Sequence, residues 1–227
     1  DLAKARELAT SLVEVANGAG LKTTALLTDM DHPLASCAGN AVEMRNAVDF
    51  LTGKARDPML YEVTVALGAE MLVSGGIAGD AADGEKRMQE AFASGAAAER
   101  FAQMVSALGG PSDFIERMDA YLETPPVHRP LMALPEHERL AGKLGFDTRQ
   151  IGLAVVELGG GRTRPQDAVD HAVGLTAIAG RDWDGKSPIC EIGARDAAAA
   201  DRAGERILAA IREAKPSEGG ILERVTA

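Results

Sequence analysis

The segment from Lys22 to Glu43 constrains the fold more strongly than any other part of the chain. Residues 22–28 are threonines and apolar residues without helical periodicity, and a glycine precedes them while a proline follows. A polar loop leads to Asn40, and Glu43 stands three residues later, which is the spacing of a helix N-cap and its reciprocal partner. The segment predicts a buried strand, a loop and a helix, and α/β proteins place ligands in such loops.

Helical periodicity surrounds this segment on both sides. Residues 2–16 predict an amphipathic helix with Leu8, Leu12 and Val15 on its apolar face. A helix, a short glycine-containing turn and a strand make up half of a crossover unit of an α/β fold. Periodic apolar residues then continue from residue 40 to residue 121, so this stretch is predicted to be mainly helical.

The clearest boundary is the proline-rich segment 123–130, because its three prolines and the residues before them do not extend a helix. The sequence after it predicts a mixture of short strands and helices. The predicted strands cover 129–134, 138–144, 174–178, 188–192 and 221–225, and the predicted helices cover 148–158 and 194–214.

Composition excludes several classes of protein. The net charge of −10 disfavours general binding to nucleic acids or to anionic membranes. No apolar run reaches the roughly 20 residues of a transmembrane helix, and no signal peptide is visible. Cys37 and Cys190 form no disulfide framework, and the four histidines show no zinc-ligand spacing. A reducing cytoplasm is therefore the predicted location.

Two short motifs have both a chemical and a structural interpretation. Asp29 and Asp31, which follow the predicted strand, could serve acid–base chemistry or bind a cation, but aspartate is also a common turn residue. Gly159-Gly-Gly-Arg162 could hold an anion with its backbone N–H groups, yet the Gly-Lys-Ser/Thr of a P-loop does not follow. The turn interpretation is favoured for both motifs.

The histidines and cysteines give no catalytic arrangement. Cys37 has no histidine at a telling spacing, and His32 in the same loop could equally be solvated. His171 is predicted to pack or to cap. Physical patterns alone therefore predict a cytoplasmic α/β protein with a site at residues 29–46.

The same segment strongly resembles the thymidine and pyrimidine-nucleoside phosphorylase family, particularly its bacterial members. The sequence T-D-M, then P-L, then A-G-N-A-x-E between residues 28 and 43 is the signature of that family. Further matches follow in the same order along the whole chain. They include Asp57-Pro58, Gly110-Pro-Ser-Asp-Phe114, Asp147-Thr-Arg149, Leu158-Gly-Gly-Gly-Arg162, Asp167-x-x-Asp170 and Val173-Gly174.

The resemblance implies the large α/β domain of a nucleoside phosphorylase. Residues 1–122 would form the C-terminal portion of its α/β core, and residues 123–227 its C-terminal mixed α/β subdomain. The N-terminal helical domain, which carries the homodimer interface of the family, is expected upstream of Asp1. The implied reaction is the reversible phosphorolysis of thymidine to thymine and 2-deoxyribose 1-phosphate.

The resemblance also indicates which site residues to expect. The Lys-His-Ser-x-Gly-Gly phosphate loop of the family and its Arg, Ser and Lys base-binding set are not in this sequence. No catalytic or substrate-binding residue is therefore assigned. Some members bind potassium through two backbone carbonyls and one acidic side chain, and these positions correspond to Leu34, Cys37 and Asn46. Asparagine replaces glutamate at the third position.

The expected co-substrate is inorganic phosphate, no cofactor is required, and potassium is the one candidate ion. The expected partners are thymidine, phosphate, a second copy of the intact enzyme and the chain's own upstream half. Two alternatives stay open. The chain could be a non-catalytic fragment or interaction module, although unpaired sheet edges argue against that. The enzyme could also accept uridine as well as thymidine.

Overall fold

The computed structural model describes residues 1–215 and 219–226. These residues form two compact units. The first contains 1–29, 56–97 and the described part of 217–227, and the second contains 30–55 and the described part of 98–216. Both units combine helices with short strands, which confirms the predicted α/β class. The division at residues 122 and 123, which follows the domains of the family, stays a prediction.

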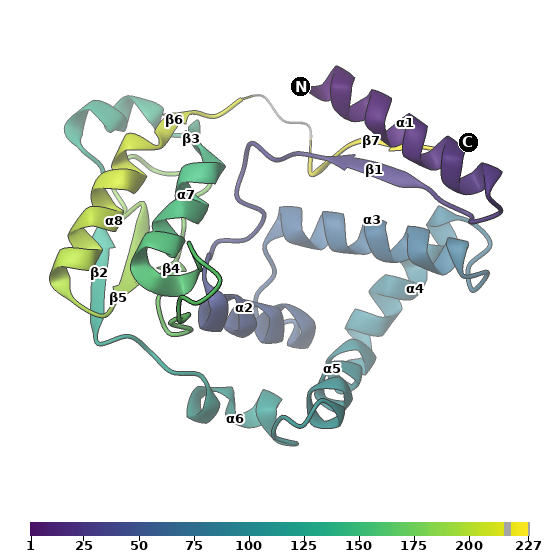
Figure 1. Ribbon diagram of the computed structural model, residues 1–227, viewed down its shortest axis with the longest axis horizontal. Helices are drawn as coiled ribbons and strands as arrows, with labels where there is room; N and C mark the ends of the chain where they lie inside the picture. The colour runs from purple at the N-terminus through teal and green to yellow at the C-terminus, as the bar shows by residue number, and fades with distance from the viewer. Residues whose placement is uncertain (216–218, 227) are drawn as a thin grey trace. The chain divides into compact units, whose positions relative to one another are not determined.

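The first unit contains a two-stranded antiparallel pair with helix α1 packed on it (Figure 1). Its elements are α1 (Leu2–Gly18), β1 (Ala25–Thr28), α3 (Pro58–Ser74), α4 (Ala81–Ala93) and β7 (Ile221–Val225). Ala9 and Val13 of α1 meet Val225 of β7, with Ala25 and Leu27 of β1 beside them. The strand predicted at 221–225 is confirmed with the same bounds.

The apolar face predicted for the first helix is wrong. Leu8, Leu12 and Val15 are 61%, 60% and 71% exposed, whereas Ala9 and Val13 are buried. Alanine at position 9 allows β1 and β7 to approach the helix closely, so the strands select the neighbouring face. The strand predicted at 22–28, which is β1 in the structure, is half-buried rather than buried. Within residues 1–215 and 219–226 it pairs with β7 alone.

Helices α3 and α4 pack closely in the same unit (Figure 1). Pro58 is the first residue of α3, as predicted, because a proline there loses no helical hydrogen bond. Asp80 caps α4 by accepting a 2.9 Å hydrogen bond from the backbone N–H of Asp83. Glu70 of α3 accepts two hydrogen bonds from Arg224 of β7, at 2.5 and 3.0 Å, and so links the helix to the strand.

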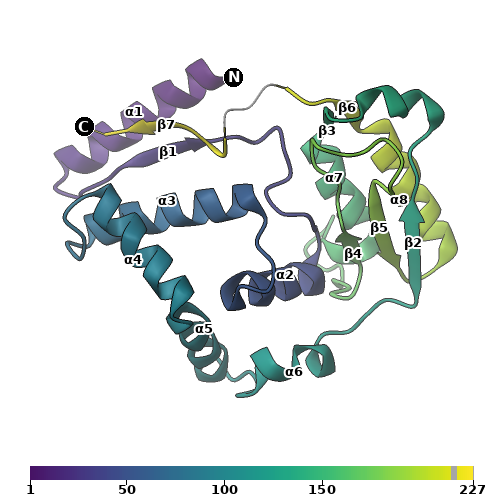
Figure 2. The same cartoon turned by 180° about the vertical axis from the view of Figure 1, so that it is seen from behind.

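The second unit contains the larger core, built on a three-stranded antiparallel sheet of order β2-β5-β4 (Figure 2). Ile192 at the centre of β5 is fully buried, and Ala203 and Ile207 of α8 are buried in the same cluster. A separate antiparallel pair joins β3 to β6. The elements are β2 (Val127–Leu131), η1 (Pro135–Leu140), β3 (Leu144–Phe146), α7 (Thr148–Val155), η2 (Val156–Gly160), β4 (Gly174–Thr176), β5 (Cys190–Ala194), α8 (Ala197–Ala209) and β6 (Ile211–Glu213).

Two predictions for this part of the chain are wrong. Of the strand predicted at 138–144, residues 138–140 belong to the 3₁₀ helix η1, which Pro135 starts and which buries Leu140, and only Leu144 lies in a strand, β3. The helix predicted over 194–214 ends at Ala209, and residues 211–213 form β6 instead. Pairing with β3, which lies more than 60 residues away in the sequence, overrides the local helical pattern there.

Three more helices complete the second unit: α2 (Asn40–Thr52), most of α5 (Ala96–Ala107) and α6 (Phe114–Tyr121). Gly53 ends α2 in the left-handed conformation, with φ of 78°. Phe114 lies 6.4 Å from the ring of Phe101 and 6.2 Å from that of Tyr121, so an aromatic cluster joins α5 and α6. In the described residues we find no helix with the length and apolar character needed to cross a membrane.

Candidate functional site

The loop between β1 and α2 is held against the sheet of the second unit by backbone hydrogen bonds. Ala38 and Leu175 of β4 exchange two bonds, of 3.0 and 2.8 Å. The N–H of Ile178 donates to the carbonyl of Ser36 at 2.9 Å, and the N–H of Ala41 donates to the carbonyl of His171 at 3.0 Å. These bonds fix the position at which α2 begins.

Gly39, Asn40 and Glu43 of the A-G-N-A-x-E motif each make a different structural contribution at the start of α2. Gly39 has φ of +137°, and a Cβ there would lie 2.7 Å from the carbonyl oxygen of Val173. Glu43 accepts a 2.9 Å hydrogen bond from the N–H of Gly39, as the predicted reciprocal partner should. Gly39, not Asn40, occupies the N-cap position, so the predicted cap residue is wrong by one. Asn40 instead donates to the carbonyl of Gly160 at 2.8 Å.

The aspartates of the loop take part in structural contacts. Asp31 accepts from Arg212 at 3.1 Å and from Lys215 at 2.8 Å. The hydroxyl of Thr148 donates to the carbonyl of Met30 at 2.8 Å and holds the same turn. The backbone N–H of Asp29 donates to the carbonyl of Gly220 at 3.0 Å. These contacts favour the structural interpretation of the Asp31 carboxylate.

The glycine-rich segment 159–162 is a tightly bonded turn. Gly159 has φ of +100°, and its carbonyl accepts a 2.8 Å bond from the N–H of Asp170. Arg162 donates to the carbonyl of Asp167 at 3.0 Å. With Asn40 bonded to Gly160, this turn positions α2 and the segment 167–171 next to each other. The geometry favours a structural turn over an anion cradle.

The buried Cys190 does not resemble a nucleophile. Burial raises the pKa of the Cys190 thiol to about 12, so it stays protonated at neutral pH. Cys37 is half-buried in the loop. Across the described residues, no group of three or more His, Cys, Asp or Glu side chains is arranged to hold a metal ion. Side-chain coordination of zinc or a similar ion therefore finds no support in this part of the chain.

The predicted potassium ligands lie on both sides of the start of α2. Leu34 is 38% exposed and Cys37 is half-buried, and both belong to the loop. Asn46 is half-buried on the second turn of α2. Two carbonyl oxygens and one amide oxygen form a neutral set of hard donors, which fits a monovalent cation. The cation site stays a prediction.

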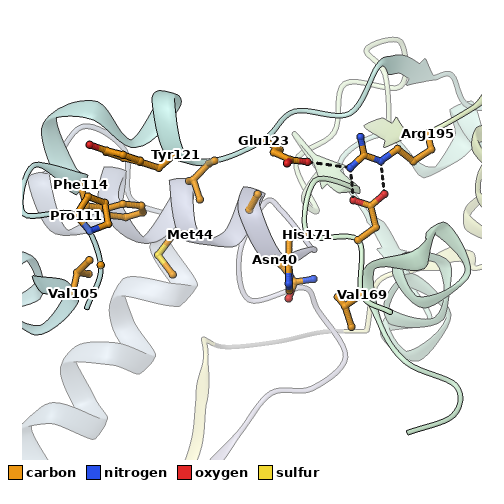
Figure 3. A pocket seen from close by; sticks show the side chains of 14 residues that line it. Asn40, Met44, Val105, Pro111, Phe114, Tyr121, Glu123, Val169, His171 and Arg195 are labelled. Carbon is orange, nitrogen blue, oxygen red and sulfur yellow. Dashed lines mark hydrogen bonds and ion pairs between the residues drawn. The ribbon is translucent and has the colours of Figure 1, made fainter. Parts of the chain in front are cut away.

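A pocket of about 760 Å³ opens beside the N-terminus of α2 (Figure 3). One end is apolar and the other is polar. The apolar end is lined by Met44, Val105, Pro111, Phe114, Tyr121 and Leu122. The polar end is lined by Asn40, Glu123, Asp170, His171 and Arg195. A volume of this size is typical of sites for small organic ligands.

Ion pairs organise the polar end of the pocket. Arg195 donates to both carboxylate oxygens of Asp170, at 2.5 and 2.8 Å, and to Glu123 at 3.2 Å (Figure 3). The guanidinium of Arg195 is the main reason that the pKa of Asp170 lies below its ordinary value. Sequence reasoning missed this pocket. Asp170 appeared only as part of a family motif, and nothing in the sequence places Arg195 beside it.

Comparison with known proteins agrees with this architecture. A family model described as "Glycosyl transferase family, a/b domain" matches residues 2–98. A second model, "Pyrimidine nucleoside phosphorylase C-terminal domain", matches residues 145–213. An α/β glycosyl transferase domain followed by this C-terminal domain defines a protein of the nucleoside phosphorylase class.

Curated relatives narrow the class to one family. The chain is 52% identical over 204 residues to a thymidine phosphorylase of Burkholderia lata, a match that covers 88% of this chain and 45% of the relative. It is 50% identical over 207 residues to a thymidine phosphorylase of Burkholderia cenocepacia, covering 90% of this chain and 46% of the relative. The chain belongs to the thymidine phosphorylase-like family, and it spans about half the length of these relatives.

Proposed function

We propose that this chain is the C-terminal part of a cytoplasmic, homodimeric enzyme that catalyses the reversible phosphorolysis of thymidine. The products are thymine and 2-deoxyribose 1-phosphate. The observation that carries the proposal is 52% identity to a thymidine phosphorylase across 88% of the chain. The match is not confined to one motif, because both the α/β segment and the C-terminal segment correspond to domains of such transferases.

In this proposal the chain supplies a rigid support for chemistry that the upstream half completes. Phosphorolysis requires a phosphate dianion close to a sugar with oxocarbenium character, in a site that excludes water. The loop before α2 is suited to such support, because hydrogen bonds from Leu175 and Ile178 fix it in place. Asn40 at the start of α2 fixes the turn at Gly160 in the same way. The groups that contact phosphate and base are expected upstream, so this chain alone should not turn over thymidine.

A chimeric enzyme tests the proposed function. The upstream part of the Burkholderia lata relative is joined to residues 1–227, which replace the matching part of that relative. We expect phosphate-dependent release of thymine from thymidine by the chimera and none by the 227-residue chain. Thymine release is followed by absorbance, with uridine tested beside thymidine. A folded chimera that shows no phosphorolysis while the relative is active would contradict the proposal.

The potassium site is part of the proposal and gives a second test. Asn46→Glu restores a carboxylate to the predicted ligand set, so it should strengthen potassium binding. A cation at ten to a hundred times its Kd stabilises the native state by about 1.4–2.7 kcal/mol. We therefore expect the thermal midpoint of Asn46→Glu to rise with KCl, whereas that of the unsubstituted chain should rise less.

Two controls separate coordination from general charge effects. Choline chloride at equal ionic strength reports screening alone. Ala47→Glu adds the same charge one residue further along α2, outside the predicted ligand set. Equal responses of Asn46→Glu and Ala47→Glu to potassium would show that Leu34, Cys37 and position 46 do not form a site.

A further inference from the structure

The C-terminal strand β7 is held in the first unit by few apolar contacts. Within the described residues it pairs with β1 on one edge and has no strand partner on the other. Of its five residues only Val225 is buried. The equally long β5 pairs on both edges, and its residues Cys190, Ile192 and Ala194 are buried. Because a two-stranded pair is only marginally stable by itself, polar contacts must supply much of what holds β7 in place.

The start of β7 is held by a carboxylate that binds its backbone. Glu62 of α3 accepts a hydrogen bond from the N–H of Gly220 at 2.9 Å and another from the N–H of Ile221 at 3.4 Å. The carbonyl of Gly220 accepts a 3.0 Å bond from the N–H of Asp29, the residue that follows β1. One exposed carboxylate therefore joins α3 to the point at which β7 meets β1.

Two ion pairs hold the rest of β7. Arg224 donates to Glu70 of α3 at 2.5 and 3.0 Å. Its neighbour Glu223 accepts from Arg6 of α1 at 2.7 and 2.9 Å. Neighbouring residues of a strand point to opposite faces, so these pairs attach β7 to a helix on each side of the two-stranded sheet (Figure 1). The side chains of Arg224 and Arg6 are 47% and 48% exposed, and such ion pairs break more easily than a buried apolar core does.

We propose that residues 220–225 form a detachable strand, which opens as one unit while the helices of the first unit stay folded. Opening breaks the contacts of Glu62, Glu70 and Arg6 but exposes few apolar side chains. It therefore costs less free energy than unfolding of the packed helices α3 and α4. Opening also exposes the edge of β1 that β7 covers, and exposed strand edges pair with other strands. The polar contacts of β7 thus limit how often β1 offers that edge.

Native-state hydrogen exchange of the 227-residue chain, followed amide by amide with NMR, tests this proposal. The amides of Gly220 and Asp29 report on β7, and the helical amide of Ala69, which is buried in α3, reports on the rest of the unit. We expect Gly220, Asp29 and the amides of β7 that bond to β1 to share one protection factor, about a hundredfold or more below that of Ala69. Low urea concentrations should change it little, because the opening exposes little surface. A protection factor equal to that of Ala69, or one that falls gradually toward one end of β7, would overturn the proposal.

Three variants separate the opening of β7 from unfolding of the whole unit. Glu62→Met removes a contact that the open form lacks, so it should lower the protection of Gly220 about tenfold. Glu85→Met, at an exposed glutamate of α4, is the matched control and should leave that protection unchanged. Phe92→Leu, at a buried ring of α4, weakens the packed helices, so it should lower the protection of Ala69 and not that of Gly220. Equal losses at Ala69 and Gly220 in Phe92→Leu would contradict a detachable strand, as would unchanged protection of Gly220 in Glu62→Met.

Discussion

Gly39→Ala is expected to lower the free energy of unfolding by about 3 kcal/mol or more. Two costs add. The backbone of Gly39, with φ of +137°, is in a region that L-residues rarely adopt, at about 1–3 kcal/mol. The new Cβ would also lie 2.7 Å from the carbonyl oxygen of Val173 and 2.8 Å from Cα of Gly174. Backbone on both sides cannot yield as a side chain could, which adds about 1–3 kcal/mol.

Urea denaturation followed by circular dichroism measures the effect, and Gly152→Ala serves as the control. Gly152 lies in helix α7 and has nothing within 4 Å of an added Cβ. Alanine there should stabilise the chain by about 0.5–1 kcal/mol, because it favours the helix. Opposite signs for the same chemical change would show that the conformation and contacts of Gly39 matter. A Gly39→Ala variant as stable as the unsubstituted chain would refute this account of the loop.

The segment 22–43 was the most predictable part of the molecule, because its signals are local. A strand, a loop and a helix occur in that order, and Glu43 accepts a hydrogen bond from the N-cap residue of α2, although that residue is Gly39 and not the predicted Asn40. The cap was misplaced by one residue because the sequence does not show that Asn40 is used elsewhere. Its amide reaches Gly160, 120 residues away.

Other features could not be predicted, because distant parts of the chain determine them. The helix periodicity at 2–16 fits two neighbouring faces, and only the packing of β1 and β7 selects Ala9 and Val13. Residues 211–213 continue a helical pattern until β3 supplies a partner. The pocket requires α2, α6 and Arg195 to converge, and no local spacing encodes that arrangement.

Arg224→Met is expected to destabilise the chain by about 2 kcal/mol near neutral pH. Glu70 is only 8% exposed, and the substitution removes the guanidinium that donates two hydrogen bonds to its carboxylate. Removing one partner of a fully buried pair costs about 3–5 kcal/mol. The loss of about 2 kcal/mol expected here is smaller because the side chain of Arg224 is partly exposed. Arg6→Met is the matched control, because it breaks a more exposed pair with Glu223 of the same strand, and it should change stability little.

The pH dependence of this loss distinguishes an electrostatic cause from lost packing. Hydrogen bonding by Arg224 is the main reason that the pKa of Glu70 lies below its ordinary value of 4.5. A carboxyl with a lowered pKa in the folded state adds stability above its ordinary pKa and loses it as the pH falls through the folded value. Without Arg224, burial pushes the pKa of Glu70 the other way, so acid should harm the variant less. Urea midpoints measured between about pH 7 and pH 3 should therefore converge for the two proteins. A gap that stays constant over this range would mean that Arg224 stabilises β7 through packing of its aliphatic chain, not through its charge.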